Sequence, residues 1–353
     1  MNFILTLLIL LLILSLIVVI HEFGHFIAAK KGGVYVDEFS LGMGPLLFKH
    51  KPKNSETTYS VRLFPIGGYV AMAEKLDSSN KKIKKDRVLE NKSFGRRLLV
   101  LLNGIIFNCI LAVFLLFLSG LIYGKPISNA TIVKVEEGSP AYYASLKEGD
   151  TIIKVNGNNV SSLEDFLLEA SAKKLKDNYV FTVKRSDGTI TDINIKPDVH
   201  TENGEEVRKY GVAFGGTTHE KGFKNAVSYA FEGFYSNTMT IVKIVGSLFT
   251  GEVKLNSLSG PVGIYSLIDQ VKSQGFETLL YLTAYLSINV AVINLIPVTV
   301  FDGGRVLLLI IEKISRKKPS EKLEYILNMS GFAFMILLML YVTFNDIIKL
   351  VVK

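Results

Sequence analysis

Four long apolar stretches dominate the pattern of hydrophobic and polar positions along the chain. They cover residues 1–30, 98–122, 277–312 and 329–353, and the third is interrupted near Pro297. Because a helix of roughly 20 residues crosses the hydrocarbon core of a bilayer, each stretch is long enough to span one. The first has no basic leading segment and no small-residue cleavage site, so we expect it to be retained. The pattern predicts a polytopic α-helical membrane protein with about four transmembrane helices.

A β-prone region follows the first stretch, within residues 31–97. Glycines and prolines separate its short runs of β-branched and aromatic residues, which lie at 34–36, 46–48, 59–63 and 69–72. Such runs predict a few strands, and their apolar character indicates a membrane-associated β-sheet region. The chain becomes polar and rich in lysine from Asp77, which indicates a connector to the second span.

The segment between the second and third spans has two parts. Residues 123–200 alternate β-prone runs with one helical stretch, and Asn156-Gly157 is a hairpin-type turn, so we expect a small α/β domain there. Residues 201–276 are expected to form a linker that contains an amphipathic helix at 223–249. Residues 313–328 are expected to form a short polar loop between the third and fourth spans.

Charge indicates how these spans are oriented. The chain carries 40 Lys+Arg against 32 Asp+Glu among its 353 residues. Basic residues cluster beside the spans at Lys30, Lys31, Lys92, Arg96, Arg97, Lys313, Arg316, Lys317 and Lys318. All three clusters flank the same side, which should be the cytoplasm, so both termini and residues 123–200 should be extracytoplasmic. Because these flanks explain the positive charge, we expect no nucleic-acid partner. A single cysteine, Cys109, excludes a disulfide framework and a cysteine-based zinc site.

The end of the first span carries an H-E-x-x-H motif, from His21 to His25. Positions i and i+4 share one helix face, so both imidazoles can reach a single metal ion. Glu22, beside the first ligand, can accept a proton from metal-bound water and pass it to the leaving amine. The alternative is two histidines at a helix end without a ligand. Ionisable groups at membrane depth are costly and usually functional, which favours metal binding.

Asp302 is the candidate third ligand, because a catalytic zinc needs three protein ligands and an open position. It lies in the third span, which is broken by Pro297 and by Gly303-Gly304. Irregular backbone at this depth survives where it lines a protein cavity, and a carboxylate there requires a cation. Asp302 could instead cap the following helix.

Three amides in the spans have two readings each. Asn294, eight residues before Asp302, could hydrogen-bond a loosened substrate backbone or could join helices. The same alternatives stay open for Asn103 and Asn108 in the second span.

These motifs, in this order, resemble the site-2 protease family of intramembrane zinc metalloproteases, of the bacterial regulator-of-sigma-E protease (RseP/RasP) type. The resemblance covers nearly the whole chain. It extends to Phe39-Ser40-Leu41-Gly42-Met43-Gly44-Pro45, Pro65-Ile66-Gly67-Gly68-Tyr69-Val70 and Leu258-Ser259-Gly260-Pro261-Val262-Gly263-Ile264. Residues 123–200 resemble one PDZ domain through Gly138-Ser139-Pro140-Ala141, Ala144, Glu148-Gly149-Asp150 and Val155-Asn156-Gly157.

The resemblance implies an intramembrane zinc endopeptidase that cuts transmembrane segments of pre-trimmed single-pass proteins, such as anti-sigma factors and remnant signal peptides. It implies Zn2+ on His21, His25 and Asp302, with Glu22 activating zinc-bound water. Substrate binding is assigned by the same resemblance to Asn294, Pro297, Gly67, Gly68 and Tyr69. The implied partners are substrate transmembrane segments and the lipid bilayer of the bacterial plasma membrane, with the active site toward the cytoplasm. The oligomeric state stays open.

This chain departs from the family pattern at three positions. Thr299 and Ile105 stand where the family has prolines, and Phe301 replaces the usual leucine, which bears on substrate preference more than on catalysis. Two other functions stay open, a metal or ion transporter and an inactive membrane scaffold with a PDZ domain. The chain has no internal repeat, which counts against a transporter, and its intact metal residues count against a scaffold. The PDZ-like domain could filter substrates by size or bind a newly exposed C-terminus.

Overall fold

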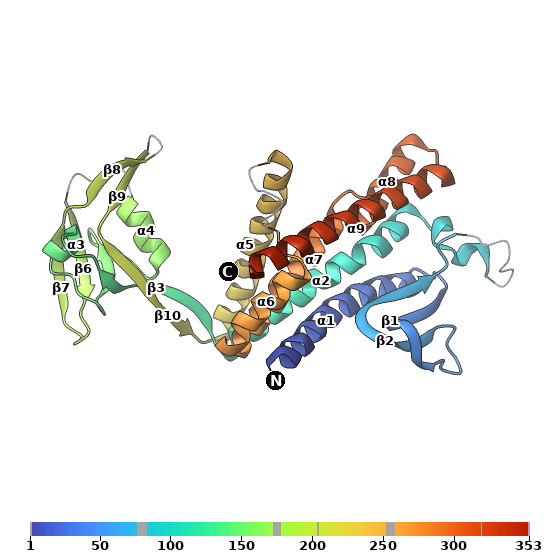
Figure 1. The fold of residues 1–353 in the computed structure, drawn as a ribbon, viewed down its shortest axis with the longest axis horizontal. Coiled ribbons are helices and arrows are strands. Elements are labelled where there is room, and N and C mark those ends of the chain that lie inside the picture. The colour runs from blue at the N-terminus through green and yellow to red at the C-terminus, as the bar shows by residue number, and fades with distance from the viewer. Residues whose placement is uncertain are drawn as a thin grey trace. The chain divides into compact units, whose positions relative to one another are not determined.

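The computed structural model of the chain describes residues 2–75, 83–171, 178–202, 205–251, 258–318 and 320–351. The chain divides into two compact units, one formed by Met1–Ser119 with Ala226–Lys353 and the other by Gly120–Asn225 (Figure 1). Positions 76–82 of the expected connector, 172–177 of the expected domain and 252–257 of the expected linker lie outside the described residues.

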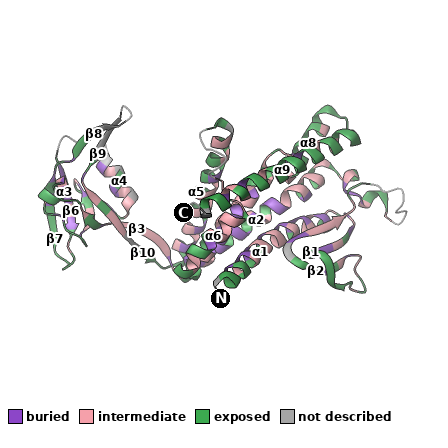
Figure 2. Ribbon diagram, in the orientation of Figure 1, coloured by how far each residue is buried: buried purple, intermediate pink, exposed green. Residues whose placement is uncertain are grey.

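Long helices form the frame of the first unit. Four are long and apolar enough to cross a membrane, namely α1 (Asn2–Lys31), α2 (Phe94–Ile122), α7 (Phe276–Leu295) and α9 (Glu321–Val351). They confirm the four predicted spans. Helix α9 begins at Glu321, before the expected residue 329. The sequence pattern misses its first turns because they are charged and lack the hydropathy of a span. Many positions on these helices are exposed, as Figure 2 shows by colour. Among them, Leu12 and Leu337 are 69% and 67% exposed, which suits positions that face lipid.

Helix α5 (Phe223–Thr250) covers the expected amphipathic segment and packs within the first unit. Its Gly233 lies beside the side chain of Leu116 on α2. Its Asn237 accepts a hydrogen bond of 3.0 Å from the hydroxyl of Tyr281 on α7. Helix α5 is therefore attached to two of the candidate spans.

Helix α6 (Pro261–Val271) has no counterpart among the elements expected from the sequence, and the short helical turn η4 (Lys272–Gln274) follows it. The carboxylate of Asp346, buried on α9, accepts hydrogen bonds of 2.8 Å from the backbone N–H groups of Gly260 and Gly263. A carboxylate at a helix N-terminus satisfies unpaired donors and opposes the helix dipole. The cap of α6 therefore comes from a residue more than 80 positions away, which local sequence patterns cannot indicate.

Two long antiparallel strands, β1 (Val36–His50) and β2 (Thr58–Met72), form the sheet that follows α1. Both strands bend, so that each contributes two arms. The first arm of β1, at 38–41, pairs on one side with 58–61 and on the other with 68–71 of β2. The second arm, at 46–50, pairs with 59–62. This confirms the predicted β-sheet region, and it leaves the arm at 68–72 on one edge.

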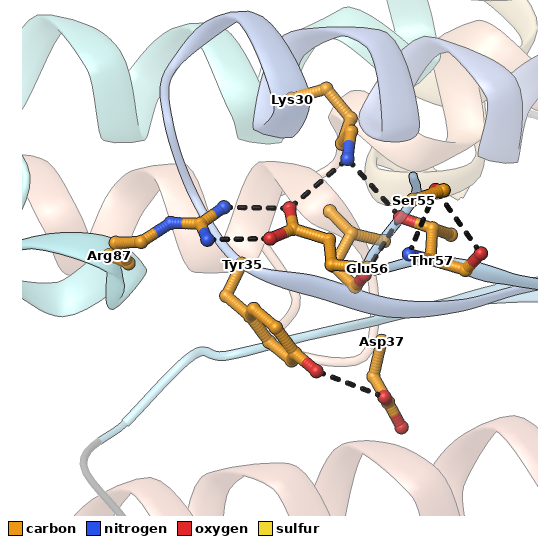
Figure 3. A network of polar contacts seen from close by, with 8 residues as sticks. Lys30, Tyr35, Asp37, Ser55, Glu56, Thr57 and Arg87 are labelled. Carbon is orange, nitrogen blue, oxygen red and sulfur yellow. Dashed lines mark hydrogen bonds and ion pairs between the residues drawn. The ribbon is translucent and has the colours of Figure 1, made fainter. Parts of the chain in front are cut away.

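A polar network fastens this sheet to the end of α1 (Figure 3). Arg87, in the short helical turn η1 (Lys85–Arg87), donates hydrogen bonds of 2.5 and 2.6 Å to the two carboxylate oxygens of Glu56. Lys30 donates to the same carboxylate at 3.1 Å and to the hydroxyl of Thr57 at 3.3 Å. Thr57 in turn donates to the carbonyl of Val36 at 2.8 Å. The network thus joins the last turn of α1, the connection between β1 and β2, and the connector.

A small apolar cluster also packs where α1, the sheet and the connector meet. It contains Ala29, Val34, Val36, Leu89 and Val100, all buried. Leu89 belongs to the short helical turn η2 (Leu89–Asn91), and Val100 to α2. The connector is therefore packed against α1 and α2 at one end of the unit.

The second unit is an α/β domain. Its elements are β3 (Lys125–Val135), α3 (Pro140–Tyr143), β4 (Thr151–Val155), β5 (Asn158–Asn159), α4 (Leu163–Ser171), β6 (Tyr179–Lys184), β7 (Ile190–Ile195), β8 (Asp198–Glu202), β9 (Glu205–Lys209) and β10 (Val212–Glu220). The main sheet has the order β10-β3-β4-β6-β7, with β5 paired to β4, while β8 and β9 form a separate hairpin. Asn156 and Gly157 adopt φ of 50° and 84° between β4 and β5, as a tight hairpin turn requires.

The domain continues past residue 200, where the sequence pattern places its end. Strand β10 pairs antiparallel with β3, from Val212 opposite Val135 to Glu220 opposite Lys125. The ring of Phe214 lies 4.7 Å from that of Phe166 on α4, so β10 also contributes to the core. The pattern misses this strand because β10 contains two central glycines and its partner lies far away in the sequence.

The network around Glu56 predicts a pH-dependent contribution to stability. The hydrogen bonds from Arg87, together with Lys30, lower the pKa of Glu56 from 4.5 to about 2. A lowered folded-state pKa stabilises the protein fully above pH 4.5, and this contribution is lost as the pH falls toward 2. Because the network is partly open to solvent, we expect Glu56→Gln to cost about 1–2 kcal/mol at pH 7.

Thermal unfolding of the purified protein in detergent, at a series of pH values, measures this contribution. The difference between wild type and Glu56→Gln should be largest near neutral pH and should shrink below pH 4.5. Asp37→Asn is the matched control, because Asp37 contacts Tyr35 at the edge of the same network but not Arg87. A difference that stays constant from pH 7 to pH 3 would contradict the assignment.

Candidate metal centre

Three side chains that can ligate a metal ion converge in the first unit. His21 Nε2 lies 3.1 Å and His25 Nε2 lies 3.3 Å from Asp302 Oδ2, and the two imidazole Nε2 atoms are 3.2 Å apart. Both histidines are buried, with 8% and 9% of their surface exposed. They lie one helical turn apart on α1, as the motif spacing predicts. The structure thus brings together the three residues that the sequence singles out as ligands.

This arrangement fits a metal ion. Asp302 Oδ2 is buried and forms no hydrogen bond among the described residues, although two ring nitrogens face it. A buried carboxylate oxygen without a hydrogen-bond partner is unfavourable unless a cation lies beside it. Gly104 keeps the space beside them open, because a Cβ there would lie 2.5 Å from His25 Nε2 and 2.8 Å from His21 Nε2. Two imidazoles and a carboxylate are a ligand set that catalytic zinc uses.

The outward ring nitrogens of the two histidines have different partners. His25 Nδ1 lies 2.7 Å from the carbonyl oxygen of Val100 on α2 and donates to it. This hydrogen bond places the proton on Nδ1 and leaves Nε2 free to bind a metal. His21 Nδ1 lies 3.3 Å from the side-chain nitrogen of Asn108, also on α2. Residues of helix α2 therefore contact the Nδ1 atom of each candidate histidine ligand.

Helices α1 and α2 approach closely where the motif lies. A Cβ at Gly24 would lie 2.3 Å from the carbonyl oxygen of Asn103, so this contact excludes any larger residue. The side chain of Asn103 donates a hydrogen bond of 2.8 Å to the carbonyl of Gly24. Of the two amides left open in the second span, Asn103 thus joins helices, whereas Asn108 contacts a candidate ligand.

Asp302 is the first residue of helix α8 (Asp302–Ser315), after a break in the chain at 296–301. The residue at the N-cap position is Phe301, which forms no side-chain cap hydrogen bond, and Asp302 follows it in the first turn, so Asp302 is not the N-cap residue considered above. A Cβ at Gly303 or Gly304 would lie 2.2 Å from the backbone of Leu295 or Val298. The two glycines therefore let α8 begin in direct contact with the break, which fixes the position of the carboxylate.

The substrate-binding candidates near the break do not contact the ligands through any hydrogen bond in the described part of the chain. Asn294 is half-buried in the last turn of α7, and Pro297 is exposed in the break. Thr299, at a position where the family resemblance leads us to expect proline, donates a hydrogen bond of 2.8 Å to the carbonyl of Leu327 on α9. A hydrogen bond thus holds the break where proline would stiffen it.

Glu22 lies beside the edge arm of β2. A Cβ at Gly68 would be 3.6 Å from Glu22 Cγ and 2.8 Å from the carbonyl oxygen of Ser40. Gly68 pairs with Leu41, and the neighbouring Tyr69 pairs with Ser40, so this arm follows β1 on one side. The edge arm, which begins with Gly68 and Tyr69 directly after Gly67, therefore passes next to the side chain of Glu22.

Sequence patterns miss the partners that hold the histidines. A backbone carbonyl such as that of Val100 has no signature in the sequence. Asn108 does leave a signal, because it is an amide within an apolar span, but the signal does not distinguish helix joining from hydrogen bonding to a substrate backbone. The structure shows a contact that neither reading named, between the Asn108 amide and the ring of His21.

Comparison with known proteins identifies the family. The model of peptidase family M50 matches residues 9–338. The protein named "Regulator of sigma-W protease RasP" of Bacillus subtilis (strain 168) is 31% identical, over 96% of this chain and 97% of its own length. Two relatives named "Putative zinc metalloprotease" come from Clostridium acetobutylicum, 33% identical over 95% of both chains, and Staphylococcus aureus (strain N315), 29% identical over 98% of this chain and 99% of that one.

These relatives cover the membrane helices and the metal motifs together, which favours a protease over a transporter or an inactive scaffold. The four candidate spans indicate that the chain is a multi-pass membrane protein. The chain therefore belongs to peptidase family M50, the site-2 protease family, and is a zinc metalloendopeptidase of the bacterial membrane.

Proposed function

We propose that this endopeptidase hydrolyses a peptide bond within the transmembrane segment of a single-pass protein whose outer domain has already been removed. The observation that carries the proposal is the convergence of His21, His25 and Asp302, next to Glu22, within helices apolar enough to span a membrane. Anti-sigma factors and remnant signal peptides are the proposed substrate classes. The name of the Bacillus subtilis relative, which refers to a sigma factor, supports the first class.

In the proposed mechanism, His21, His25 and Asp302 hold the zinc ion. Bound zinc supplies Lewis acidity, which polarises a carbonyl group and lowers the pKa of water. Glu22 accepts the proton of the attacking water and then donates it to the leaving amine. The half-buried position of Glu22 supports this role, because its side chain lies beside Gly68 in the proposed substrate-binding arm and it directly follows the candidate ligand His21.

The edge arm of β2 is the proposed receiver of the substrate. A peptide bond inside a helix is shielded by its own hydrogen bonds, so a substrate helix must be opened before water can attack. An exposed strand edge supplies replacement hydrogen bonds by adding the substrate as a further strand. Among the described residues the arm at 68–72 pairs with β1 alone, which leaves its other edge available. Asn294 and Pro297 are proposed to contact the opened substrate from the break before α8.

The orientation of the chain in the membrane is proposed from its charges. The guanidinium of Arg97 at the start of α2 forms ion pairs of 2.8 and 2.9 Å with Glu312 near the end of α8. Lys318 pairs with Glu90 in the connector, and Lys30 pairs with Glu56. The basic clusters thus lie at one end of the first unit, and we assign that end to the cytoplasm. Both termini and the Gly120–Asn225 unit are then extracytoplasmic.

The Gly120–Asn225 unit is proposed to be a PDZ-like domain that limits access of untrimmed substrates. A folded body outside the membrane obstructs proteins with bulky outer domains and needs no particular terminal sequence. The second possibility is docking of a C-terminus along β10, whose outer edge is unpaired in the described sheet. Helix α4 lies beside this strand, since the ring of Phe166 on α4 is 4.7 Å from the ring of Phe214 on β10.

The metal assignment predicts that Asp302→Ala weakens zinc retention more than about tenfold and abolishes cleavage, because one of three ligands is lost. Zinc content is measured on the purified protein, and cleavage on a membrane-spanning peptide in detergent. Glu22→Gln is the matched control: it should retain zinc while cleavage falls by about 10²–10⁴-fold. Zinc content and activity unchanged in Asp302→Ala would refute the ligand assignment.

The strand-addition proposal predicts that proline within the edge arm slows cleavage of stable helices more than cleavage of helix-weakened substrates. Proline removes a backbone donor and cannot take part in a ladder on that side. Val70→Pro tests the arm beside Glu22, and Leu47→Pro in the opposite edge arm is the matched control. Equal losses for the two substrates in Val70→Pro, or equal effects of both variants, would count against this role.

The filter proposal predicts that removing the domain permits cleavage of an untrimmed substrate and leaves a trimmed one cleavable. Because Pro126 and His219 are antiparallel partners, residues 127–218 can be replaced by an Asn-Gly turn that closes a short hairpin. Cleavage of both substrates is compared with wild type at equal zinc content. If the folded, zinc-loaded variant no longer cuts the trimmed substrate, the domain is a docking site and the filter proposal is wrong.

A further inference from the structure

Asn108 lies on α2 behind the candidate ligand His21 and is completely buried. Its side-chain nitrogen is 3.3 Å from His21 Nδ1, and its side-chain oxygen is buried without a hydrogen-bond partner among the described residues. Its backbone carbonyl accepts a hydrogen bond of 2.9 Å from the hydroxyl of Ser287, which is buried on α7. Asn108 is therefore held between two helices with its amide against the ring of His21.

A neutral imidazole carries one proton, so one ring nitrogen donates and the other accepts. With the Asn108 nitrogen toward His21, the amide donates to Nδ1, and the ring proton lies on Nε2, 3.1 Å from Asp302 Oδ2. Metal ligation through Nε2 requires the opposite tautomer, with the proton on Nδ1 and an acceptor to receive it. His25 already has such an acceptor in the carbonyl of Val100.

We propose that Asn108 is a positioning residue that selects the metal-binding tautomer of His21. A half-turn of its amide exchanges the oxygen and nitrogen within nearly the same volume. The unpartnered oxygen then accepts the Nδ1 proton, and Nε2 is free to ligate the metal. Asn108 thereby does for His21 what the Val100 carbonyl does for His25. The inference rests on the metal site proposed above and adds a residue that holds one of its ligands.

The test distinguishes whether His21 needs a hydrogen-bond acceptor or a hydrogen-bond donor from the side chain at position 108. Asn108→Leu has similar volume and removes both functions, whereas Asn108→Asp keeps an acceptor and cannot donate when ionised. Zinc dissociation constants are measured by chelator competition on the full-length protein in detergent, with helix content and elution volume as checks of folding. We expect zinc binding to weaken about 10–100-fold in Asn108→Leu, and to equal or exceed wild-type affinity in Asn108→Asp.

Asn103→Leu is the matched control, because Asn103 lies on the same helix and contacts the backbone of Gly24 rather than a ligand. It should change zinc affinity less than about threefold, well below the loss expected when ligand support is removed. The inference is overturned if Asn108→Leu binds zinc like wild type, if Asn108→Asp is as weak as Asn108→Leu, or if Asn103→Leu loses as much. Failure of the wild type to bind zinc would instead overturn the metal site itself, and with it this inference.

Discussion

The mutual approach of three polar groups that can ligate a metal ion, inside a set of apolar helices, is the constraint on which the rest of this structure depends. His21, His25 and Asp302 come from two helices far apart in the sequence, and misplaced groups in such a site would be buried without compensation. Their positions are secured mainly by small residues. Gly24 and Gly104 allow α2 to approach the motif, and Gly303 and Gly304 allow α8 to begin against the preceding break.

The same constraint explains why two kinds of polar contact occur in different parts of the first unit, one beside the candidate ligands and the other at its basic end. Near the ligands they are few and specific, and each joins a side chain to a backbone group or to a ring nitrogen. At the basic end, ion pairs such as Arg97–Glu312 and Arg87–Glu56 are more numerous and partly exposed. Charged pairs at that end remain favourable when they are partly hydrated. An amide beside a buried imidazole, by contrast, bears on which ring nitrogen carries the proton.

Much of this architecture could be predicted from sequence where a single physical signal dominates. Apolar length revealed the four spans, and the i,i+4 spacing revealed that His21 and His25 share a face. Local patterns could not reveal the features whose stability or geometry depends on residues far away in the sequence. Strand β10 gains its stability from β3, helix α6 gains its cap from Asp346, and the tautomer of His25 is set by a backbone carbonyl. None of these three relations leaves a periodicity or a spacing in the sequence.

The pairing of Lys125 with Glu220 means that the Gly120–Asn225 unit begins and ends at neighbouring points. A domain whose ends meet can be inserted into a host, lost or exchanged without changing the distance that the host chain must bridge. Evolution could therefore vary the Gly120–Asn225 part of such a protease independently of its membrane part. The separate cores of the two units support this independence, because the aromatic cluster around Phe166 contains no residue of the membrane helices.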